Sequence, residues 1–336
     1  MALFKKLRSS PRLSVIVIVY SMPRQALNTI YSLSPAYQQN VGKKDYEIIV
    51  VENRSKNNMD EAELAAITGN IRYYLRDESL PTPVNAINFG VDQAKAKNIC
   101  ILVDGARMVT PKLIHYMLQA QTLYPSPVIS APGYHLGKEL QQNAVLSGYN
   151  EEKEQELLAP IDWKNNGYRL LEVSCLSGTS SNGFFLPIGE SNTIGTSKHV
   201  FDKVGGFNPG FTDTGGGQCN LDFYKRIVEL PGTQLVLLLG EGSFHQYHGG
   251  VTTGRDTGGV RDEMMQRHFD QYHSIRGEYY KPPQVEPIYF GEIPPAGMRF
   301  IHHSAQAARR KSGELPHPDW EGELRHKPPT RTESGK

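Results

Sequence analysis

Leu13-Ser-Val-Ile-Val-Ile-Val-Tyr20 is the stretch from which the fold can be argued. Its residues are mostly β-branched and apolar, and the run stops after a few positions, which is typical of a strand buried on both faces. Two similar runs follow at Tyr46–Glu52 and Ile99–Val103. A further strong strand is expected at Gln234–Leu239. The chain therefore holds several buried strands that are spread along its length.

Segments with helical spacing of apolar residues separate these strands. The helices expected in the first half are Arg24–Leu33, Met59–Thr68, Pro83–Ala96 and Thr110–Leu123, the last with Pro111 at its first helical position. Later helices are expected at Lys198–Val204 and Asn220–Glu229, and in part of 256–280. Alternation of strand and helix predicts an α/β fold, with a mostly parallel sheet covered by helices on both faces.

Polar residues follow the expected strands at their carboxyl ends. Tyr20 ends the first, Glu52 to Ser55 end the second, and Asp104 follows the third. Ligands of parallel sheets bind beyond the carboxyl ends of the strands. We therefore expect these residues to gather at one rim of the sheet.

The composition excludes several classes of protein. The 336 residues include 36 Lys+Arg and 35 Asp+Glu, a net charge of +1, and 38% are hydrophobic. Such a chain is not disordered throughout, and it lacks the basic footprint of a nucleic-acid-binding protein. Three cysteines are too few for a disulfide framework, which favours a reducing compartment.

No targeting or membrane-spanning segment is found in the sequence. The apolar run 13–20 is too short to cross a bilayer, and no small-residue cleavage site follows it. We expect a cytoplasmic protein. The basic leader, residues 1–12, leaves open a peripheral contact with the inner surface of the membrane.

Seven short motifs, met in order between residues 13 and 253, resemble those of GT-A glycosyltransferases of the inverting, family 2 type. The opening strand is similar to the family's "SVVIPTYNR". The other matches are Val50–Ser55 to "VVDDGSTD", Asn88–Ala94 to "N-x-G-x-x-x-A", Ile101–Ala106 to "fLDaD", Val204–Phe211 to "vGGFdE.F", Gly217–Arg226 to "GEDxDLxxR" and His248–Thr252 to "H-x-G-G-x-S". Each match alone is weak, but their shared order is specific.

The resemblance implies a GT-A fold and an enzyme that moves a sugar from a nucleotide-diphosphate sugar to a saccharide or lipid-linked acceptor, in surface polysaccharide or glycan biosynthesis. The expected donor-binding residues are Tyr20, Glu52, Asn53, Ser55, Asn88, Asp104 and Arg107. A divalent cation, Mn²⁺ or Mg²⁺, is expected at Asp104, His248 and His245, because carboxylate oxygen and imidazole are suitable ligands.

Two departures from the family's motifs affect the expected chemistry. Ala106 stands where the family has a second metal-binding aspartate. Residues 218–220, Gln-Cys-Asn, replace the "GED" that holds the general base. An inverting transfer needs a group to accept the proton of the acceptor hydroxyl. The candidates for that base are Asp213 and Glu190, while Asp222 is expected to stabilise the first turn of its helix.

Because of these two departures, two other functions remain possible alternatives. One is a catalytically degenerate GT-A protein that binds a sugar or nucleotide without turnover. The other is a nucleotidyltransferase, which the glycine-free loop 21–24 disfavours. The donor base, the acceptor, the stereochemistry and the oligomeric state are left undetermined.

The sequence divides into five parts on this interpretation. They are a basic leader at 1–12, a nucleotide-sugar-binding half at 13–125, an acceptor-binding half at 126–255, a helical and proline-rich extension at 256–303, and a tail expected to be disordered at 304–336.

Overall fold

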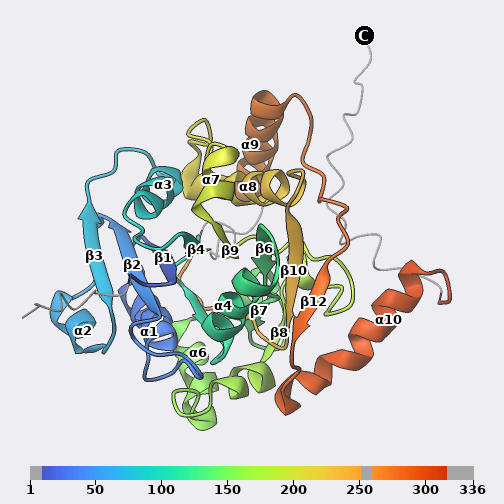
Figure 1. The fold of residues 1–336 in the computed structure, drawn as a ribbon, viewed down its shortest axis with the longest axis horizontal. Helices are drawn as coiled ribbons and strands as arrows, with labels where there is room; N and C mark the ends of the chain where they lie inside the picture. Colours follow the sequence, from blue (N-terminus) through green and yellow to red (C-terminus); the bar gives the residue numbers. More distant parts are fainter. Residues whose placement is uncertain (1–9, 251–258, 316–336) are drawn as a thin grey trace, which may run out of the picture.

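The computed structural model describes residues 10–250 and 259–315. Most of the leader, and the tail beyond residue 315, lie outside these ranges. Within them, eight strands form a main sheet in the order β12-β10-β6-β9-β4-β1-β2-β3 (Figure 1). These strands are β1 Leu13–Val19, β2 Tyr46–Asn53, β3 Ile71–Arg76, β4 Asn98–Leu102, β6 Pro127–Ser130, β9 Thr193–Ser197, β10 Gln234–Leu239 and β12 Ile288–Gly291.

The main sheet is mostly parallel, as the sequence predicts. β1 pairs in parallel with β2 and β4, and β10 pairs in parallel with β6 and β12. β9 is antiparallel to both of its neighbours, β4 and β6. The carboxyl ends of β1, β2 and β4 therefore lie at one edge of the sheet, which is where we expect a ligand.

A second sheet of four short strands lies beside the first. Its order is β5-β11-β7-β8, formed by β5 Arg107–Val109, β11 Ser243–His245, β7 Gly133–Leu136 and β8 Ser174–Leu176. β11 is antiparallel to β5 and parallel to β7. This small sheet brings residues that follow β4 next to residues from the end of the second half.

Helices cover both faces of the main sheet. The α-helices are α1 Pro23–Leu33, α2 Glu61–Ala66, α3 Val84–Asp92, α4 Leu113–Leu123, α5 Gln141–Ala144, α6 Glu151–Leu158, α7 Lys198–Lys203, α8 Cys219–Val228, α9 Gly259–Arg276 and α10 Ile301–Lys311. Short 3₁₀ helices lie at Val145–Ser147, Ala159–Ile161, Gly167–Val173, Gly178–Ser180, Thr214–Gly216 and Pro295–Phe300. None of the helices in the described ranges is both long and apolar enough to cross a membrane.

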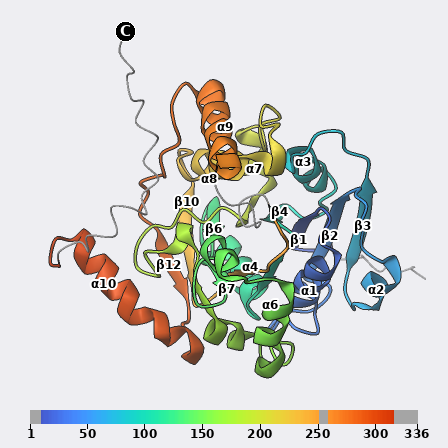
Figure 2. The same ribbon diagram turned by 180° about the vertical axis from the view of Figure 1, so that it is seen from behind.

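Strand β1 shows how the sequence builds both cores. Val15 and Val17 point into an apolar cluster with α1 and α4. Ile16 and Ile18, which alternate with them, join a second cluster with α3, α7 and α8. Figures 1 and 2 show these two groups of helices on opposite sides of the sheet. Burial on both faces explains why the strand reads as an unbroken apolar run.

Three details differ from the sequence prediction. Helix α4 begins at Leu113, so Pro111 lies outside it. The backbone there bonds elsewhere, since Thr110 N donates to Gly242 O and Pro111 O accepts from Gln39 N. The segment expected to be disordered from residue 304 begins within helix α10. The proline-rich extension contributes β12 to the main sheet.

Gly90 in α3 is expected to be intolerant of a side chain. A Cβ atom there would lie 2.5 Å from Ile16 Cγ2 and 3.2 Å from Val51 Cγ2. Both neighbours are fully buried and cannot move aside. Gly90→Ala should therefore lower the free energy of unfolding by about 1–3 kcal/mol, although the same change inside a helix normally stabilises. Urea unfolding measures this, with Gly178→Ala, where a Cβ meets nothing within 4 Å, as the control.

Candidate active site

An open groove of about 790 Å³ lies at the carboxyl ends of β1 to β3. Tyr20, which follows β1, is 60% exposed and forms part of its wall. The other lining residues are Arg54, Ser55, Lys56, Arg76, Asp77, Glu78, Ser79 and Asn85. The lining holds both basic and acidic side chains, and Arg54 pairs with Asp77 at 2.6 Å, so the groove suits a polar ligand.

Asp104 is fixed in the tight turn between β4 and β5. Its Oδ1 accepts a hydrogen bond from Ala106 N at 2.9 Å, which leaves Oδ2 to face outward from the turn. Glycine is required at position 105, between Asp104 and Ala106, because a Cβ there would lie 2.6 Å from Ile18 O at the end of β1. The turn therefore packs closely against the end of β1 and places Asp104 at the edge of the sheet where we expect a ligand.

The register of the small sheet sets His245 between two other polar residues. His245 on β11 pairs with Arg107 on β5 and with His135 on β7. Directly paired residues of neighbouring strands project on the same face. The three side chains therefore form one row that leads to Asp104.

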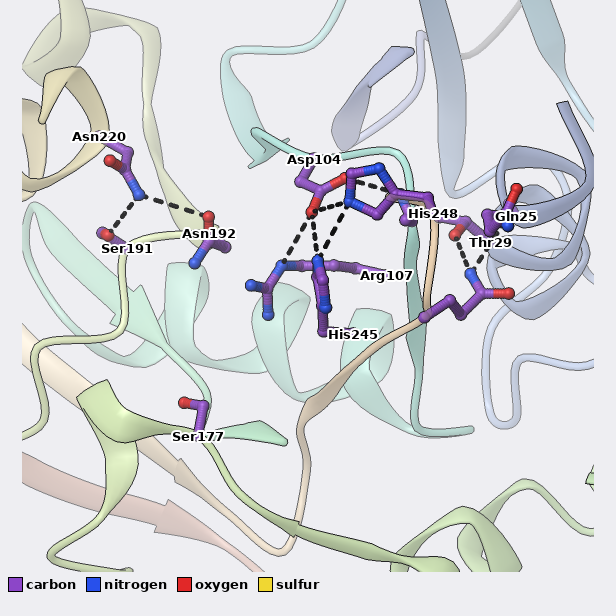
Figure 3. Close-up of polar contacts among 12 residues, drawn as sticks. Gln25, Thr29, Asp104, Arg107, Ser177, Ser191, Asn192, Asn220, His245 and His248 are labelled. Atoms are coloured by element: carbon purple, nitrogen blue, oxygen red, sulfur yellow. Dashed lines mark hydrogen bonds and ion pairs between the residues drawn. The ribbon is translucent and has the colours of Figure 1, made fainter. Parts of the chain in front are cut away.

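Asp104, His245 and His248 form a cluster with the geometry of a cation site (Figure 3). Asp104 Oδ2 lies 3.1 Å from His245 Nε2 and 3.6 Å from His248 Nε2. The two imidazole Nε2 atoms are 3.2 Å apart. One ligand atom from each residue lies within 4.8 Å of the others. The structure thus brings together the three residues that the sequence predicts for a metal.

The charges in the cluster suit metal binding. Burial works to raise the pKa of Asp104, but His248 and His245 hold it well below its usual range, so the carboxylate is ionised. Burial lowers the pKa of His245 to about 4, and this outweighs the opposing effect of Asp104. A neutral imidazole keeps a lone pair on one nitrogen, which is the form that binds a metal.

Arg107 supplies a buried positive charge beside the cluster. Its side chain is 8% exposed, and Nε lies 3.9 Å from Asp104 Oδ2. Nε and Nη1 are buried without a hydrogen-bond partner among the described residues. Unpaired buried donors are costly, and phosphate oxygens are the acceptors that a guanidinium pairs with best. The residues present therefore fit a bound phosphate group.

The other donor-binding residues expected from the sequence divide into two groups. Asn53 and Ser55 lie at the rim, and the buried Oδ1 of Asn53 has no partner. Glu52 is fully buried, and its carboxylate accepts from Tyr73 Oη at 2.6 Å and from Met59 N. Glu52 therefore lies below the groove, and its hydrogen bonds hold the start of the loop that follows β2.

Asn88 has both ends of its amide engaged. Its Nδ2 donates to Phe207 O at 2.9 Å, and its Oδ1 accepts from Phe207 N at 3.0 Å. This pair of bonds joins α3 to the loop after α7. The side chain therefore connects two elements of the fold.

The two candidates for the general base differ in their surroundings. Glu190 is fully buried, and its carboxylate accepts from Thr179 Oγ1 at 2.7 Å and from Asn192 N at 2.9 Å. Burial works to raise the pKa of Glu190, but Arg107 and these donors lower it. This makes it a poor proton acceptor. Asp213 lies partly exposed in the loop before the glycines 215–217, close to His268 of α9.

Asn220, which stands in the "GED" position, is part of a neutral polar group with Ser191 and Asn192 (Figure 3). Its Nδ2 donates to Ser191 Oγ at 2.9 Å and to Asn192 Oδ1 at 3.3 Å. Asn192 in turn donates from its own Nδ2 to Glu190. Amides and hydroxyls hold this side of the site, where the family motif has a carboxylate.

Sequence reasoning missed the residues that hold the segment 245–248 in place. Gln246 is fully buried, and its Nε2 donates to Gln25 O and to Thr29 Oγ1 of α1. Tyr247 O accepts from Gln25 Nε2, and Tyr247 N donates to Glu154 of α6. The residues that hold this segment are uncharged, or are charged and paired with a neighbour, and none belongs to a sequence motif. Only the fold therefore shows that they support the segment 245–248.

Glu154 gives this network a dependence on pH. Burial raises the pKa of Glu154 to about 7, although Tyr247 N and Arg24 act to lower it. A carboxyl whose folded-state pKa is raised stabilises the protein below its unfolded pKa, and that stability is lost as pH rises through about 7. As pH rises from 4 to 8, the free energy of unfolding of Glu154→Gln should therefore increase by up to roughly 3 kcal/mol relative to that of wild type.

Chemical denaturation at a series of pH values measures this difference. Glu151→Gln is the control, because Glu151 lies on the same helix, pairs with Arg24 and is half exposed. A constant difference between Glu154→Gln and wild type across the range would contradict the assignment.

Comparison with known proteins agrees with the motifs. Residues 14–166 match the sequence model described as "Glycosyl transferase family 2". Among solved structures, S. aureus TarS is similar at 11% identity, with a TM-score of 0.47 over 78% of this chain and 44% of that chain. Thus the chain spans less than half of that protein's length. No curated protein sequence matches the chain significantly.

Two further similar structures contain a sugar nucleotide. TarS 1–349 in complex with UDP-GlcNAc has 12% identity and a TM-score of 0.47, over 93% of this chain and 78% of that one. The mannosyltransferase PcManGT from Pyrobaculum calidifontis, in complex with GDP-Man and Mn²⁺, has 14% identity and a TM-score of 0.45, over 92% and 77%. Residues 14–166, a little under half of the chain, therefore match a glycosyl transferase family 2 domain, and the mostly parallel sheet with helices on both faces is the fold that this match implies.

Proposed function

We propose that the chain transfers a sugar from a nucleotide-diphosphate sugar to a saccharide or lipid-linked acceptor, in the biosynthesis of surface polysaccharide or another glycan. The observation that carries this proposal is the convergence of Asp104, His245 and His248 at the rim of the sheet, beside Arg107, whose buried Nε and Nη1 have no hydrogen-bond partner among the described residues. A carboxylate, two imidazoles and a guanidinium with unused hydrogen-bond donors suit a pyrophosphate and its metal.

The donor would lie along the groove from Tyr20 to Arg107. Tyr20 and Ser55 line the groove, and the free Oδ1 of Asn53 can accept from a base N–H. Asp104, His245 and His248 would hold Mn²⁺ or Mg²⁺, which would neutralise the charge that develops on the departing nucleoside diphosphate. Arg107 would share that charge through its unpaired donors.

The position of Ala106 accounts for the unusual ligand set. Ala106 is fully buried and belongs to the apolar cluster packed against α1. A carboxylate at this position would face the core, where an unpaired charge is costly. Two histidines from β11 and the residues after it take the place of the family's second aspartate in the proposed site.

A catalytically degenerate binding protein is the second candidate, and one observation favours it. The neutral group around Asn220 has no carboxylate, and Glu190 beside it is already saturated by donors. Asp213 is the remaining candidate that can accept a proton from an acceptor hydroxyl, because its side chain is partly exposed. Asp213→Asn should therefore abolish transfer and leave donor binding unchanged if the chain is an enzyme.

A thermal-shift panel tests the proposed donor site. The protein is heated with UDP, GDP, ADP, CDP and their sugar conjugates, each with and without Mn²⁺ or Mg²⁺. A ligand that binds only the folded state raises Tm by mass action. A metal-dependent shift with one nucleotide would support the proposal. The absence of a shift with every nucleotide would contradict it, and a shift without turnover of any sugar nucleotide would favour the degenerate binding protein.

A further inference from the structure

We propose that Gln141 is a positioning residue that fixes the proton of His245 on Nδ1 and so directs the Nε2 lone pair at the cation site. Gln141 is the first residue of α5, in a part of the chain where the sequence carries no motif. The inference rests on the proposed function for its cation, but the position of the proton can be tested without one.

Two hydrogen bonds join the side chain of Gln141 to His245. Its Nε2 donates to His245 O at 2.9 Å, and its Oε1 lies 2.5 Å from His245 Nδ1. Gln141 is fully buried, and His245 is 6% exposed. Water therefore does not compete for these groups.

The carbonyl of His245 decides which way the amide of Gln141 is turned. A carbonyl oxygen accepts hydrogen bonds only, so the NH₂ end of the amide must face it. The oxygen end then faces Nδ1 of the same histidine. An amide oxygen also only accepts, so Nδ1 must carry a proton, and in the neutral imidazole, which is the form that binds a metal, Nε2 then holds the lone pair.

The lone pair points at the proposed cation. Nε2 of His245 is the atom 3.1 Å from Asp104 Oδ2 and 3.2 Å from His248 Nε2. In its neutral form, with the single proton held on Nδ1, His245 cannot donate to the carboxylate, so two acceptor atoms face each other. That arrangement is repulsive unless a cation, or a proton from His248, lies between them. Gln141 thus maintains the site in a form that attracts a cation.

Gln141 also sets the proton of a second histidine, His135. The backbone N of Gln141 donates to His135 Nδ1 at 2.9 Å, so His135 carries its proton on Nε2. The rings of His135 and His245 lie 5.4 Å apart on neighbouring strands. One residue therefore holds two adjacent imidazoles in opposite tautomers. An amide does so without adding a charge beside the ligands.

The position of the proton can be measured by ¹⁵N NMR on the metal-free protein labelled at histidine, with the His245 signals assigned from their loss in His245→Gln. Wild type is expected to carry the proton on Nδ1. Gln141→Met keeps the volume and removes both hydrogen bonds, so His245 should shift toward the Nε2-protonated form. Gln141→Glu restores the oxygen acceptor for Nδ1, but not the donor to His245 O, and should return the proton to Nδ1.

Gln38→Met is the matched control. Gln38 is also buried, donates to two carbonyl groups and accepts from Ile114 N, but it contacts none of the three cluster residues. The control should leave the His245 signals unchanged. A wild-type His245 protonated on Nε2, or a Gln141→Met variant with the wild-type tautomer, would overturn the proposal.

Titration with MnCl₂ alone, followed by electron paramagnetic resonance, connects the tautomer to the metal. Loss of an outer partner of a ligating histidine typically weakens metal binding about 10–100-fold, and we expect that loss for Gln141→Met with recovery in Gln141→Glu. Equal Mn²⁺ affinity in Gln141→Met and wild type would contradict the positioning role. A wild-type protein with the Nδ1 proton that binds no Mn²⁺ would contradict the proposed cation site and would support the assigned tautomer.

Discussion

Asp104→Asn is expected to reduce the release of nucleoside diphosphate from the donor on the order of 10³-fold or more, because it removes charge stabilisation of several kcal/mol. Asp104 is the one carboxylate among the three candidate metal ligands found within the described residues. Asparagine keeps an oxygen that can accept from Ala106 N, so the turn should survive. The loss should therefore come from the missing negative charge.

The measurement is the rate of nucleoside diphosphate release, with the sugar nucleotide that gives the largest thermal shift. Asp162→Asn is the matched control: Asp162 is exposed and adopts a positive φ of 43°, which asparagine also tolerates. Its rate should equal that of wild type. An Asp104→Asn enzyme with more than a tenth of the wild-type rate would show that the chemistry does not depend on this carboxylate.

Asp222→Ala should lower the free energy of unfolding by about 3–5 kcal/mol, the cost of breaking a buried ion pair by removing one partner. Asp222 is 1% exposed. Its two oxygens accept from Arg226 Nε at 2.8 Å and from Arg276 Nε at 2.5 Å. Because Arg276 lies near the end of α9, this carboxylate fastens α9 to α8, a role wider than stabilising the first turn of its own helix.

Urea unfolding measures the effect of Asp222→Ala. The control is Glu229→Ala, which removes the pair between Lys225 and Glu229 on the outer side of α8. An exposed pair of this kind contributes about 0.5 kcal/mol or less. If both variants lost the same small amount, the link between α8 and α9 would add nothing to the stability of the fold.

The central architecture could be predicted from the sequence because β1, β2 and β4 are buried on both faces. A strand in that position must be apolar throughout, so Tyr46–Asn53 and its neighbours can be predicted as strands from their local sequence alone. Strands such as β5 and β11 have three residues each and were not predicted. They depend on pairing with each other, which local sequence does not encode.

The candidate site was predictable in part for the same reason. Asp104 follows a strand that the local sequence predicts, and His248 belongs to a motif that resembles one of the family's. Glu52 and Asn88 were expected in the donor site, but a polar residue at a strand end or on a helix serves structure or ligand equally well in sequence. Gln141 gives no signal at all, since its role depends on the register that places His245 beside it.

The pairing of β5 with β11 has a consequence for how the protein is made. Arg107 and Asp104 leave the ribosome long before His245 and His248, and the strands that line the groove are complete by Arg76. Contacts so distant along the chain form only after the intervening segment has been synthesised and closed. A nascent chain that stops short of residue 243 already contains the strands that line the groove but lacks His245 and His248, so the proposed cation site is the last part of the proposed donor site to be synthesised.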